Sequence, residues 1–553
     1  MDKIWLAEYD EGVPAEIDPS IHPSLKEVIE VNCARFSDRT AYSNMGVAIT
    51  FAELDRLSLQ FGAYLRSVAG LSRGDRVAIM LPNVLQYPIA VLGALRAGLV
   101  VVNVNPMYTP RELKYQLEDS GARAILVMEN FAATLQEVVD QSDIERIITT
   151  QLADMFPPIK RATVNFVVKR IKKLVPPFLL KDAVKFRDAL KQGDDSELPD
   201  ERLTHEDIAF LQYTGGTTGV AKGAVLTHGN MVANVLQASE WLRPVTKEGE
   251  EVIVCALPLY HIFALLANCL TYMSLGGENM LITNPRDFKG FVKTLQTSRF
   301  TGILGVNTLF NSLLNTPGFA ECDFRSLHVS LGGGMAVQRA VAEKWKAVTG
   351  QPLIEAYGLT ETSPAACMNP MTNDCYNGSI GLPIPSTEVT IRDDDGNVLP
   401  IGEVGEICIQ GPQVMREYWH RPKETENVML DGRWLRTGDI GRLDERGYVF
   451  IEDRKKDMIL VSGFNVYPNE VEAVAALHSG ILEAAAVAMP DPGSGEVVKL
   501  FVVRNDPKLT EDHVIAHCRG QLSAYKVPKQ VEFRDSLPKS NVGKILRRAL
   551  KGQ

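Results

Sequence analysis

The chain has 553 residues, of which 45% are hydrophobic and 23% are charged, and its formal net charge is −10 at pH 7. This length requires at least two domains, and the acidic balance excludes indiscriminate binding to nucleic acid. The eight cysteines show no C-x-x-C or Cys/His metal spacing, and we expect reduced, mostly buried thiols in a cytoplasmic protein without a secretory signal.

The first third of the chain alternates between short apolar runs and helical patterns. The apolar runs are continuous rather than alternating, which is typical of parallel strands buried on both faces of a sheet. We therefore predict a doubly wound α/β domain. Its expected elements are strand 76–81, helix 87–97, strand 99–104, strand 124–128, helix 132–141 and strand 147–148.

Residues 159–187 stand out by their charge. Nine Lys and Arg residues face a single acid, Asp182, and the cations alternate with large apolar side chains over 164–175. A basic amphipathic segment of this kind either lies on an anionic membrane surface or forms a solvated helix on the protein itself. The pattern leaves both interpretations open, the first of which would place the protein at the inner face of the cytoplasmic membrane.

The densest cluster of glycine and threonine in the chain lies just after an apolar run at 210–213. Glycine lets backbone N–H groups approach a bound anion, the threonine hydroxyls add donors, and Lys222 adds a mobile positive charge. Because Lys222 is followed by Gly223, the segment does not match the Walker A pattern. It predicts a phosphate-binding loop made of Tyr213, Thr214, Gly215, Gly216, Thr217, Thr218, Gly219, Val220, Ala221, Lys222 and Gly223.

Residues 252–277 contain no Asp, Glu, Lys or Arg and are long enough to span a membrane. Pro258, His261 and the Gly276–Gly277 pair interrupt this stretch. The interruptions favour a buried strand, a turn at 257–261 and a core helix over a membrane span.

The second half of the chain changes in its pattern of apolar and polar residues. A strand at 300–306 and a helix at 336–348 continue the α/β theme, whereas short alternating strands after about Gly381 indicate a β-rich subdomain. The last hundred residues mix helix and strand in an α+β arrangement. We predict a large domain over 1–452 and a small, mobile C-terminal domain over 453–553.

Four further segments accompany the phosphate-binding loop. They read GGG at 332–334, EAYGLTE at 355–361, WLRTGD at 434–439 and PKSNVGK at 538–544. With these segments the whole chain resembles the adenylate-forming superfamily, and residues 431–460 resemble the signature of bacterial long-chain fatty acid–CoA ligases. Residues 416–419, Arg-Glu-Tyr-Trp, depart from the Gly-Tyr-Trp of many members, and we assign them no chemical role.

The resemblance implies a two-step reaction. A fatty acid carboxylate attacks the α-phosphorus of ATP, pyrophosphate leaves, and the thiol of coenzyme A then displaces AMP from the acyl-adenylate. Because both first reactants are anions, Mg²⁺ and cationic side chains must offset their repulsion. The same resemblance implies that the small domain rotates between the steps, so that residues 462–465 face coenzyme A in the second.

The resemblance also implies roles for individual residues. Lys544 would bridge the acyl carboxylate and the α-phosphate, and Glu361 with Thr214 would hold Mg²⁺. Asp453 would begin the hinge. His261 either gates the acyl pocket or is an ordinary core histidine. Nucleotide contacts outside the loop are implied for Gly333, Tyr357, Gly358, Thr360, Asp439 and Arg454.

Several alternatives to a long-chain fatty acid remain open. A medium-chain or aryl acid would suit the same motifs, and a non-catalytic protein that binds nucleotide or fatty acid would share part of them. An amino acid is disfavoured because its ammonium group needs an anionic partner. Residues 257–275 and 301–310, which we expect to line the acyl site, contain no Asp or Glu.

Overall fold

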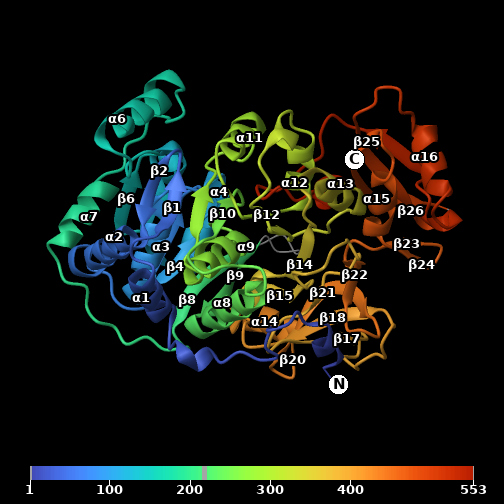
Figure 1. The fold of residues 1–553 in the computed structure, drawn as a ribbon, viewed down its shortest axis with the longest axis horizontal. Helices are drawn as coiled ribbons and strands as arrows, with labels where there is room; N and C mark the ends of the chain where they lie inside the picture. Colours follow the sequence, from blue (N-terminus) through green and yellow to red (C-terminus); the bar gives the residue numbers. More distant parts are fainter. Residues whose placement is uncertain (1–2, 215–220, 493, 552–553) are drawn as a thin grey trace.

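The computed structural model describes residues 3–214, 221–492 and 494–551. Figure 1 shows two large sheets with their helices, a smaller β-rich part, and a C-terminal part drawn in red. The α/β class, with a smaller C-terminal domain that contains its own sheet, is confirmed. The boundary at residue 453 stays a prediction.

The first large sheet contains the strands that the apolar runs predicted. Alternate residues of one strand enter two separate cores: Val77 and Ile79 pack in the main core, and Ala78 and Met80 pack on the opposite face. The sheet is therefore buried on both sides, as its continuous apolar strands predict. Its order is β19 (Glu417–Tyr418), β9 (Lys222–Thr227), β8 (Ile208–Thr214), β4 (Val100–Asn103), β3 (Arg76–Met80), β5 (Ala122–Met128), β6 (Arg146–Thr150) and β7 (Val184–Lys185).

The second large sheet has nine strands and a parallel centre. Register pairs such as Gly302 with Val329 and Gly305 with Gly332 align the strand ends at one edge. Its order is β16 (Leu382–Pro383), β15 (Ala365–Met368), β14 (Ile354–Gly358), β13 (Val329–Gly332), β12 (Gly302–Gly305), β10 (Val252–Cys255), β11 (Glu278–Leu281), β1 (Thr40–Asn44) and β2 (Val47–Thr50).

Two smaller sheets follow in the C-terminal half. The β-rich subdomain consists of β17 (Glu388–Arg392), β18 (Gly405–Gln410), β21 (Trp434–Leu443), β20 (Met429–Leu430) and β22 (Val449–Arg454), which pairs with β21. The last sheet has its own apolar core. It consists of β24 (Phe464–Val466), β23 (Ile459–Val461), β26 (Gly495–Arg504), β25 (Ile481–Asp491) and β27 (Gln530–Phe533).

The helices cover the sheets and connect their strands. They are α1 (Leu25–Arg35), α2 (Phe51–Ala63), α3 (Gln86–Arg96), α4 (Pro110–Ser120), α5 (Ala132–Gln136), α6 (Pro158–Phe166), α7 (Phe186–Asp194), α8 (His228–Leu242), α9 (Ile262–Ala264), α10 (Tyr272–Ser274), α11 (Phe288–Gln296), α12 (Asn307–Leu314), α13 (Arg339–Thr349), α14 (Pro422–Val428), α15 (Pro468–Ala476) and α16 (Glu511–Arg519).

The helix predicted over 132–141 is wrong in extent. Helix α5 ends at Gln136, and a single 3₁₀ turn follows at Val139–Gln141. Between them Val138 is buried and leaves helical backbone with φ −127°. The chain therefore turns this apolar side chain into the core instead of continuing the helix.

The uncharged stretch at 252–277 forms the strand, turn and core helix that its interruptions predict. Strand β10 is followed by a continuous helical segment from Ile262 to Ser274, whose middle, Leu265–Thr271, is a π-helix. Among the described residues, no helix combines the length and apolar composition needed to cross a bilayer.

Strand β14 of the second sheet carries a buried carboxyl group, that of Glu355. Glu355 in β14 is buried, and its Oε1 accepts a hydrogen bond of 3.0 Å from the Val337 N–H. Burial raises the pKa of Glu355 to about 8, against 4.5 ordinarily. The side chain thereby holds the turn that follows β13, and it does so in its protonated form at neutral pH.

We expect Glu355→Gln to become more stable than the wild type as the pH rises. Because the folded state keeps the Glu355 proton up to about pH 8, the wild type loses free energy of unfolding between the ordinary carboxyl pKa and that pH, by at most about 1.4 kcal/mol per pH unit. An amide keeps the hydrogen bond without this loss. Urea unfolding at several pH values measures the difference.

The matched control is Glu403→Gln, because Glu403 is an exposed glutamate. Its stability should follow that of the wild type at every pH. If the free energy of unfolding depends on pH in the same way for Glu355→Gln and the wild type, Glu355 is ionised in the folded protein.

Candidate functional site

A cavity of about 690 Å³ lies where three of the sheets and the C-terminal segment approach one another. Thr214 and Lys222 reach it from the first sheet, Tyr357 from the second, Asp439 from the β-rich subdomain and Lys544 from the C-terminal segment. Segments more than 300 positions apart in the chain therefore form one wall.

The cavity brings together most of the residues that the sequence singled out. Those that line it are Thr214, Lys222, His261, Gly333, Tyr357, Gly358, Thr360, Glu361, Asp439, Arg454 and Lys544. The loop residues Gly215, Gly216, Thr217, Thr218, Gly219 and Val220 lie outside the described residues.

Tyr213, Ala221 and Gly223 are not among the described residues that line the cavity. The Tyr213 hydroxyl donates to Asp119 Oδ2 at 2.7 Å, and the Ala221 carbonyl accepts from the Tyr115 hydroxyl at 2.8 Å. A side chain on Gly223 would meet the Tyr213 ring at 3.2 Å. These residues anchor the two ends of the loop, and direct contact with a nucleotide stays a prediction for them.

Tyr357 and Asp439 meet on one side of the cavity. The Tyr357 hydroxyl donates to Asp439 Oδ2 at 2.6 Å, and Arg454 Nε lies 3.3 Å from Asp439 Oδ1. Burial, followed by the Asp439 charge, raises the pKa of Tyr357 well above its usual value. Next to Tyr357, a Cβ on Gly358 would lie 1.8 Å from the Pro364 carbonyl oxygen, so only glycine fits there. This side offers a neutral ring beside a carboxylate.

Glu361 and Lys222 lie on another side of the cavity. Glu361 Oε1 accepts from the Tyr418 hydroxyl at 2.6 Å, and Lys222 Nζ lies 4.9 Å from the centre of the Tyr418 ring. Lys222 Nζ also bonds Glu424 Oε2 at 2.6 Å. The lysine of the loop is therefore paired with a carboxylate that an incoming phosphate would have to displace.

Lys544 enters the cavity from the C-terminal domain on a short turn. The Thr308 hydroxyl donates to the Gly543 carbonyl at 2.9 Å, and Asn311 Nδ2 donates to the Leu482 carbonyl at 3.0 Å, so α12 holds this turn and its sheet in place. Burial, followed by the charge of the nearby Arg454, lowers the pKa of Lys544 to about 7, although the Asp439 charge opposes the shift.

The two roles that the sequence left open for His261 do not exclude each other, and the gating role stays a prediction. Its Nδ1 accepts a hydrogen bond of 3.3 Å from the Phe263 N–H and so caps the helical segment that begins at Ile262. The same side chain lines the cavity. Burial, and then the Lys544 charge, lower the pKa of His261 to about 4, so the imidazole is neutral.

Charge separates the cavity into two parts. In the polar part six cationic residues accompany three acidic ones among the described lining residues, although the whole chain has a net charge of −10. The other part is apolar and is lined by Ala238, Leu242, Leu257, Ile262, Phe263, Leu266, Ala267, Leu304, Val306 and Leu331. The cavity thus suits a polyanion joined to an apolar chain.

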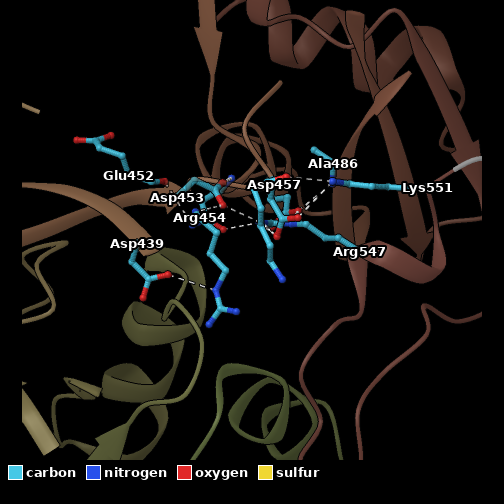
Figure 2. A network of polar contacts seen from close by, with 11 residues as sticks. Asp439, Glu452, Asp453, Arg454, Asp457, Ala486, Arg547 and Lys551 are labelled. Carbon is cyan, nitrogen blue, oxygen red and sulfur yellow. Dashed lines mark hydrogen bonds and ion pairs between the residues drawn. The ribbon is translucent and has the colours of Figure 1, made fainter. Parts of the chain in front are cut away.

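The Asp453 side chain lies in a buried polar network rather than in the cavity wall (Figure 2). Its Oδ1 accepts from Arg547 Nη1 at 2.9 Å and its Oδ2 accepts from the Asn469 N–H at 2.7 Å. Arg547 also bonds both carboxylate oxygens of Glu472, at 2.8 and 2.7 Å. The carboxylate of the predicted hinge is therefore tied to the C-terminal domain.

Sequence reasoning missed several residues of this site, and three of them affect the geometry or charge of the groups described above. Tyr418 lies in the segment to which we assigned no role, yet it lines the cavity and orients Glu361. Lys456 lines the polar part, and Thr308 holds the Lys544 turn. The aromatic residue at 418 was visible within a family motif, whereas the contact of Thr308 joins positions 235 apart and leaves no local signal.

Two family descriptions match this chain. The AMP-binding enzyme family covers residues 29–419, and the AMP-binding enzyme C-terminal domain covers residues 470–544. The chain is also 56% identical to the long-chain-fatty-acid–CoA ligase of Escherichia coli O6:H1 over 553 residues, which are 100% of this chain and 98% of the relative.

Solved structures of the same fold cover nearly the whole chain. ATP-bound MatB from Rhodopseudomonas palustris matches with a TM-score of 0.76 and 28% identity, over 94% of this chain and 98% of that one. The anthranilate CoA ligase AuaEII in complex with anthranoyl-AMP matches with a TM-score of 0.86 over 97% and 98%; its 23% identity shows the fold alone.

Proposed function

The chain belongs to the AMP-binding enzyme family, and we propose that it is an ATP-dependent long-chain fatty acid–CoA ligase that works through an acyl-adenylate. One observation carries this function: a single cavity joins a cationic part to an apolar part that lacks Asp and Glu. The full-length identity of 56% to a long-chain-fatty-acid–CoA ligase supports the same function. Its products are acyl-CoA, AMP and pyrophosphate.

The polar part of the cavity accommodates ATP in this proposal. Tyr357 and Gly333 contact the adenine, the Asp439 carboxylate accepts hydrogen bonds from the ribose hydroxyls, and Arg454 supports it from 3.3 Å. Thr360 contacts the α-phosphate, and Lys222 leaves Glu424 for the outer phosphates. Such fixed charges stabilise the developing negative charge during transfer.

The acyl carboxylate would lie between Lys544 and the α-phosphate. The Lys544 cation draws both anions together and stabilises the charge that builds up as the new P–O bond forms and pyrophosphate leaves. Neutral His261 stands at the start of the apolar part, where it can limit access to the acyl chain without attracting a second anion.

A divalent cation fits the proposed site. Glu361 and Thr214 line one cavity and offer a carboxylate and a hydroxyl oxygen, and Mg²⁺ commonly takes few protein ligands beside water and substrate phosphates. When bound there, Mg²⁺ would neutralise the outer phosphates. The Tyr418 hydroxyl fixes the Glu361 carboxylate at 2.6 Å and thereby presents its other oxygen.

The second step requires a different arrangement of the small domain. In this structure Lys544 lies in the cavity, whereas residues 462–465 form the tip between β23 and β24, outside the described cavity wall. This arrangement corresponds to adenylation. We propose that residues 453–553 rotate about the chain near Asp453 so that the 462–465 tip contacts coenzyme A.

Lys544→Ala should lower palmitate-dependent exchange of labelled pyrophosphate into ATP by about 10²–10³-fold, because a charge that stabilises the transition state is lost. Transfer from supplied palmitoyl-adenylate to coenzyme A should remain. Wild-type exchange with palmitate but not with aryl or amino acids supports the proposed function. Wild-type exchange with none of these acids would refute it.

The pH dependence of exchange provides an independent check on Lys544. The working form is the cation, and a pKa of about 7 means that kcat/KM falls as the pH rises through that value. Lys544→Arg keeps its charge at these pH values, so any residual activity should lose this alkaline limb. An unchanged limb in that variant would assign the titration to another group.

Thr308→Val should slow adenylation about five- to tenfold, because the hydrogen bond that holds the Lys544 turn contributes on the order of 1 kcal/mol. Transfer from palmitoyl-adenylate to coenzyme A should be unchanged or faster. Ser312→Ala on the same helix is the matched control. Equal loss in both half-reactions would mean that Thr308 supports the fold rather than the domain arrangement.

We also propose that α6 and the π-helical residues after it contact an anionic membrane surface. Figure 1 shows α6 standing out from the body, far from the C-terminal domain. The exposed apolar residues Ile159, Phe166 and Ile171 lie beside the exposed cations Arg170 and Lys172. A surface that combines both kinds of side chain favours the interface of an anionic bilayer.

Reversal of Arg170, Lys172 and Lys173 to Glu should abolish most sedimentation with vesicles that contain anionic lipid, because each cation contributes about 1 kcal/mol to such binding. Reversal of Arg286, Lys289 and Lys293, which are also exposed, changes the net charge equally and should leave binding intact. Equal loss in both triple variants would indicate a general charge effect and contradict the proposed surface.

A further inference from the structure

Near the end of α4 lies a buried carboxylate that belongs to none of the motifs. The Asp119 side chain is only 9% exposed, and Asp119 does not line the described cavity wall. Because a charge removed from water is costly, a carboxylate at such a position needs partners that stabilise it. The identity of those partners shows which parts of the molecule this charge holds together.

One oxygen of this carboxylate holds the strand that leads into the predicted phosphate-binding loop. The Tyr213 hydroxyl donates to Asp119 Oδ2 at 2.7 Å. Burial, followed by this hydrogen bond, raises the pKa of Tyr213 above its usual value, so the hydroxyl stays protonated and remains a donor. Tyr213 pairs with Gly223 across β8 and β9. The next pair joins Thr214 to Lys222, which both line the cavity, so Asp119 fixes the strand pair that carries them.

The other oxygen holds the segment that follows β19. Arg421 Nη2 donates to Asp119 Oδ1, and Trp419 Nε1 donates to the Asp119 backbone carbonyl at 3.1 Å. The Arg421 N–H in turn donates to the Tyr418 carbonyl at 3.1 Å. Tyr418 is the residue whose hydroxyl orients Glu361. Asp119 therefore also fixes the segment that presents Tyr418 to the cavity.

A second side chain of α4 supports both connections. Tyr115 lies four residues before Asp119 and therefore on the same face of the helix. Its hydroxyl donates to the Ala221 carbonyl at 2.8 Å and accepts from Arg421 Nη2 at 3.3 Å. The Ala221 carbonyl belongs to the C-terminal end of the loop. One face of α4 thus holds both ends of the loop and the segment that carries Tyr418, from outside the described cavity wall.

We propose that Asp119 is a positioning residue, which aligns the outer-phosphate side of the ATP site from behind the cavity wall. This inference rests on the proposed ligase function and adds a residue to its ATP site. Of the two proposed Mg²⁺ ligands, Thr214 ends β8 of the first sheet and Glu361 follows β14 of the second. Asp119 reaches the first through Tyr213 and the second through the 418–421 segment. Because Mg²⁺ demands near-ideal octahedral geometry, a small shift of either ligand would weaken its binding together with that of the outer phosphates.

This role predicts that ATP and AMP respond differently. AMP has no outer phosphates, and its adenine and ribose would contact Tyr357 and Asp439 on another side of the cavity. The test measures Kd by calorimetry for ATP with Mg²⁺ and for AMP. Asp119→Asn removes the charge, and Tyr213→Phe removes one hydrogen bond and keeps the ring. Glu118→Gln changes the exposed carboxylate next to Asp119 on α4 and is the matched control.

We expect Asp119→Asn and Tyr213→Phe each to raise the Kd for ATP about five- to tenfold and to leave the Kd for AMP within about twofold of the wild type, because a contact behind the phosphate side is lost. The double variant should bind ATP about as weakly as Asp119→Asn alone, since both changes break the same contact. Glu118→Gln should change neither Kd.

Equal loss of ATP and AMP affinity in both variants would overturn the inference, because Asp119 would then support the fold as a whole. Unchanged ATP affinity would overturn it as well. A wild type that binds ATP and a set of variants that follow this pattern, but no pyrophosphate exchange with any acid, would refute the ligase function and leave the role of Asp119 intact.

Discussion

The arrangement of the whole site depends on where one ammonium group lies. Lys544 belongs to a domain with its own core, yet it reaches a cavity whose other walls come from three separate sheets. The hydrogen bond from Thr308 to the Gly543 carbonyl, at 2.9 Å, holds it there. Burial makes the charged form of Lys544 unfavourable when the cavity holds no anion. When anions are bound, the same buried charge interacts with them strongly.

The fold itself could be predicted in large part from the sequence. Continuous apolar runs identified β3, β4, β5 and β6, and the two buried faces of that sheet explain why those runs do not alternate. Interruptions by proline and glycine correctly divided residues 252–277 into a strand and a helix. The extent of α5 was wrong, because a single buried valine at 138 ended the helix where periodicity would have continued it.

The candidate site could be predicted only where each residue belongs to a short motif. Tyr357, Glu361, Asp439 and Lys544 all line one cavity, as their motifs predict. Contacts between distant segments left no such signal: Tyr418 and Glu361 are 57 positions apart, and their hydrogen bond of 2.6 Å follows from the packing of β19 against β9.

In the proposed rotation of the C-terminal domain, the buried ion pairs around Asp453 limit where the backbone can bend. Because Arg547 and the Asn469 N–H bind both oxygens of that carboxylate, Asp453 must travel as part of the C-terminal body. A rotation of the C-terminal domain would therefore change the backbone dihedral angles of the residues just before Asp453. It would also break the last pairs between β21 and β22, which join Ile440 to Asp453 and Asp439 to Arg454. The second of these pairs includes Asp439, the proposed ribose-binding carboxylate. The rotation that withdraws Lys544 from the cavity would therefore also weaken the binding of the departing AMP.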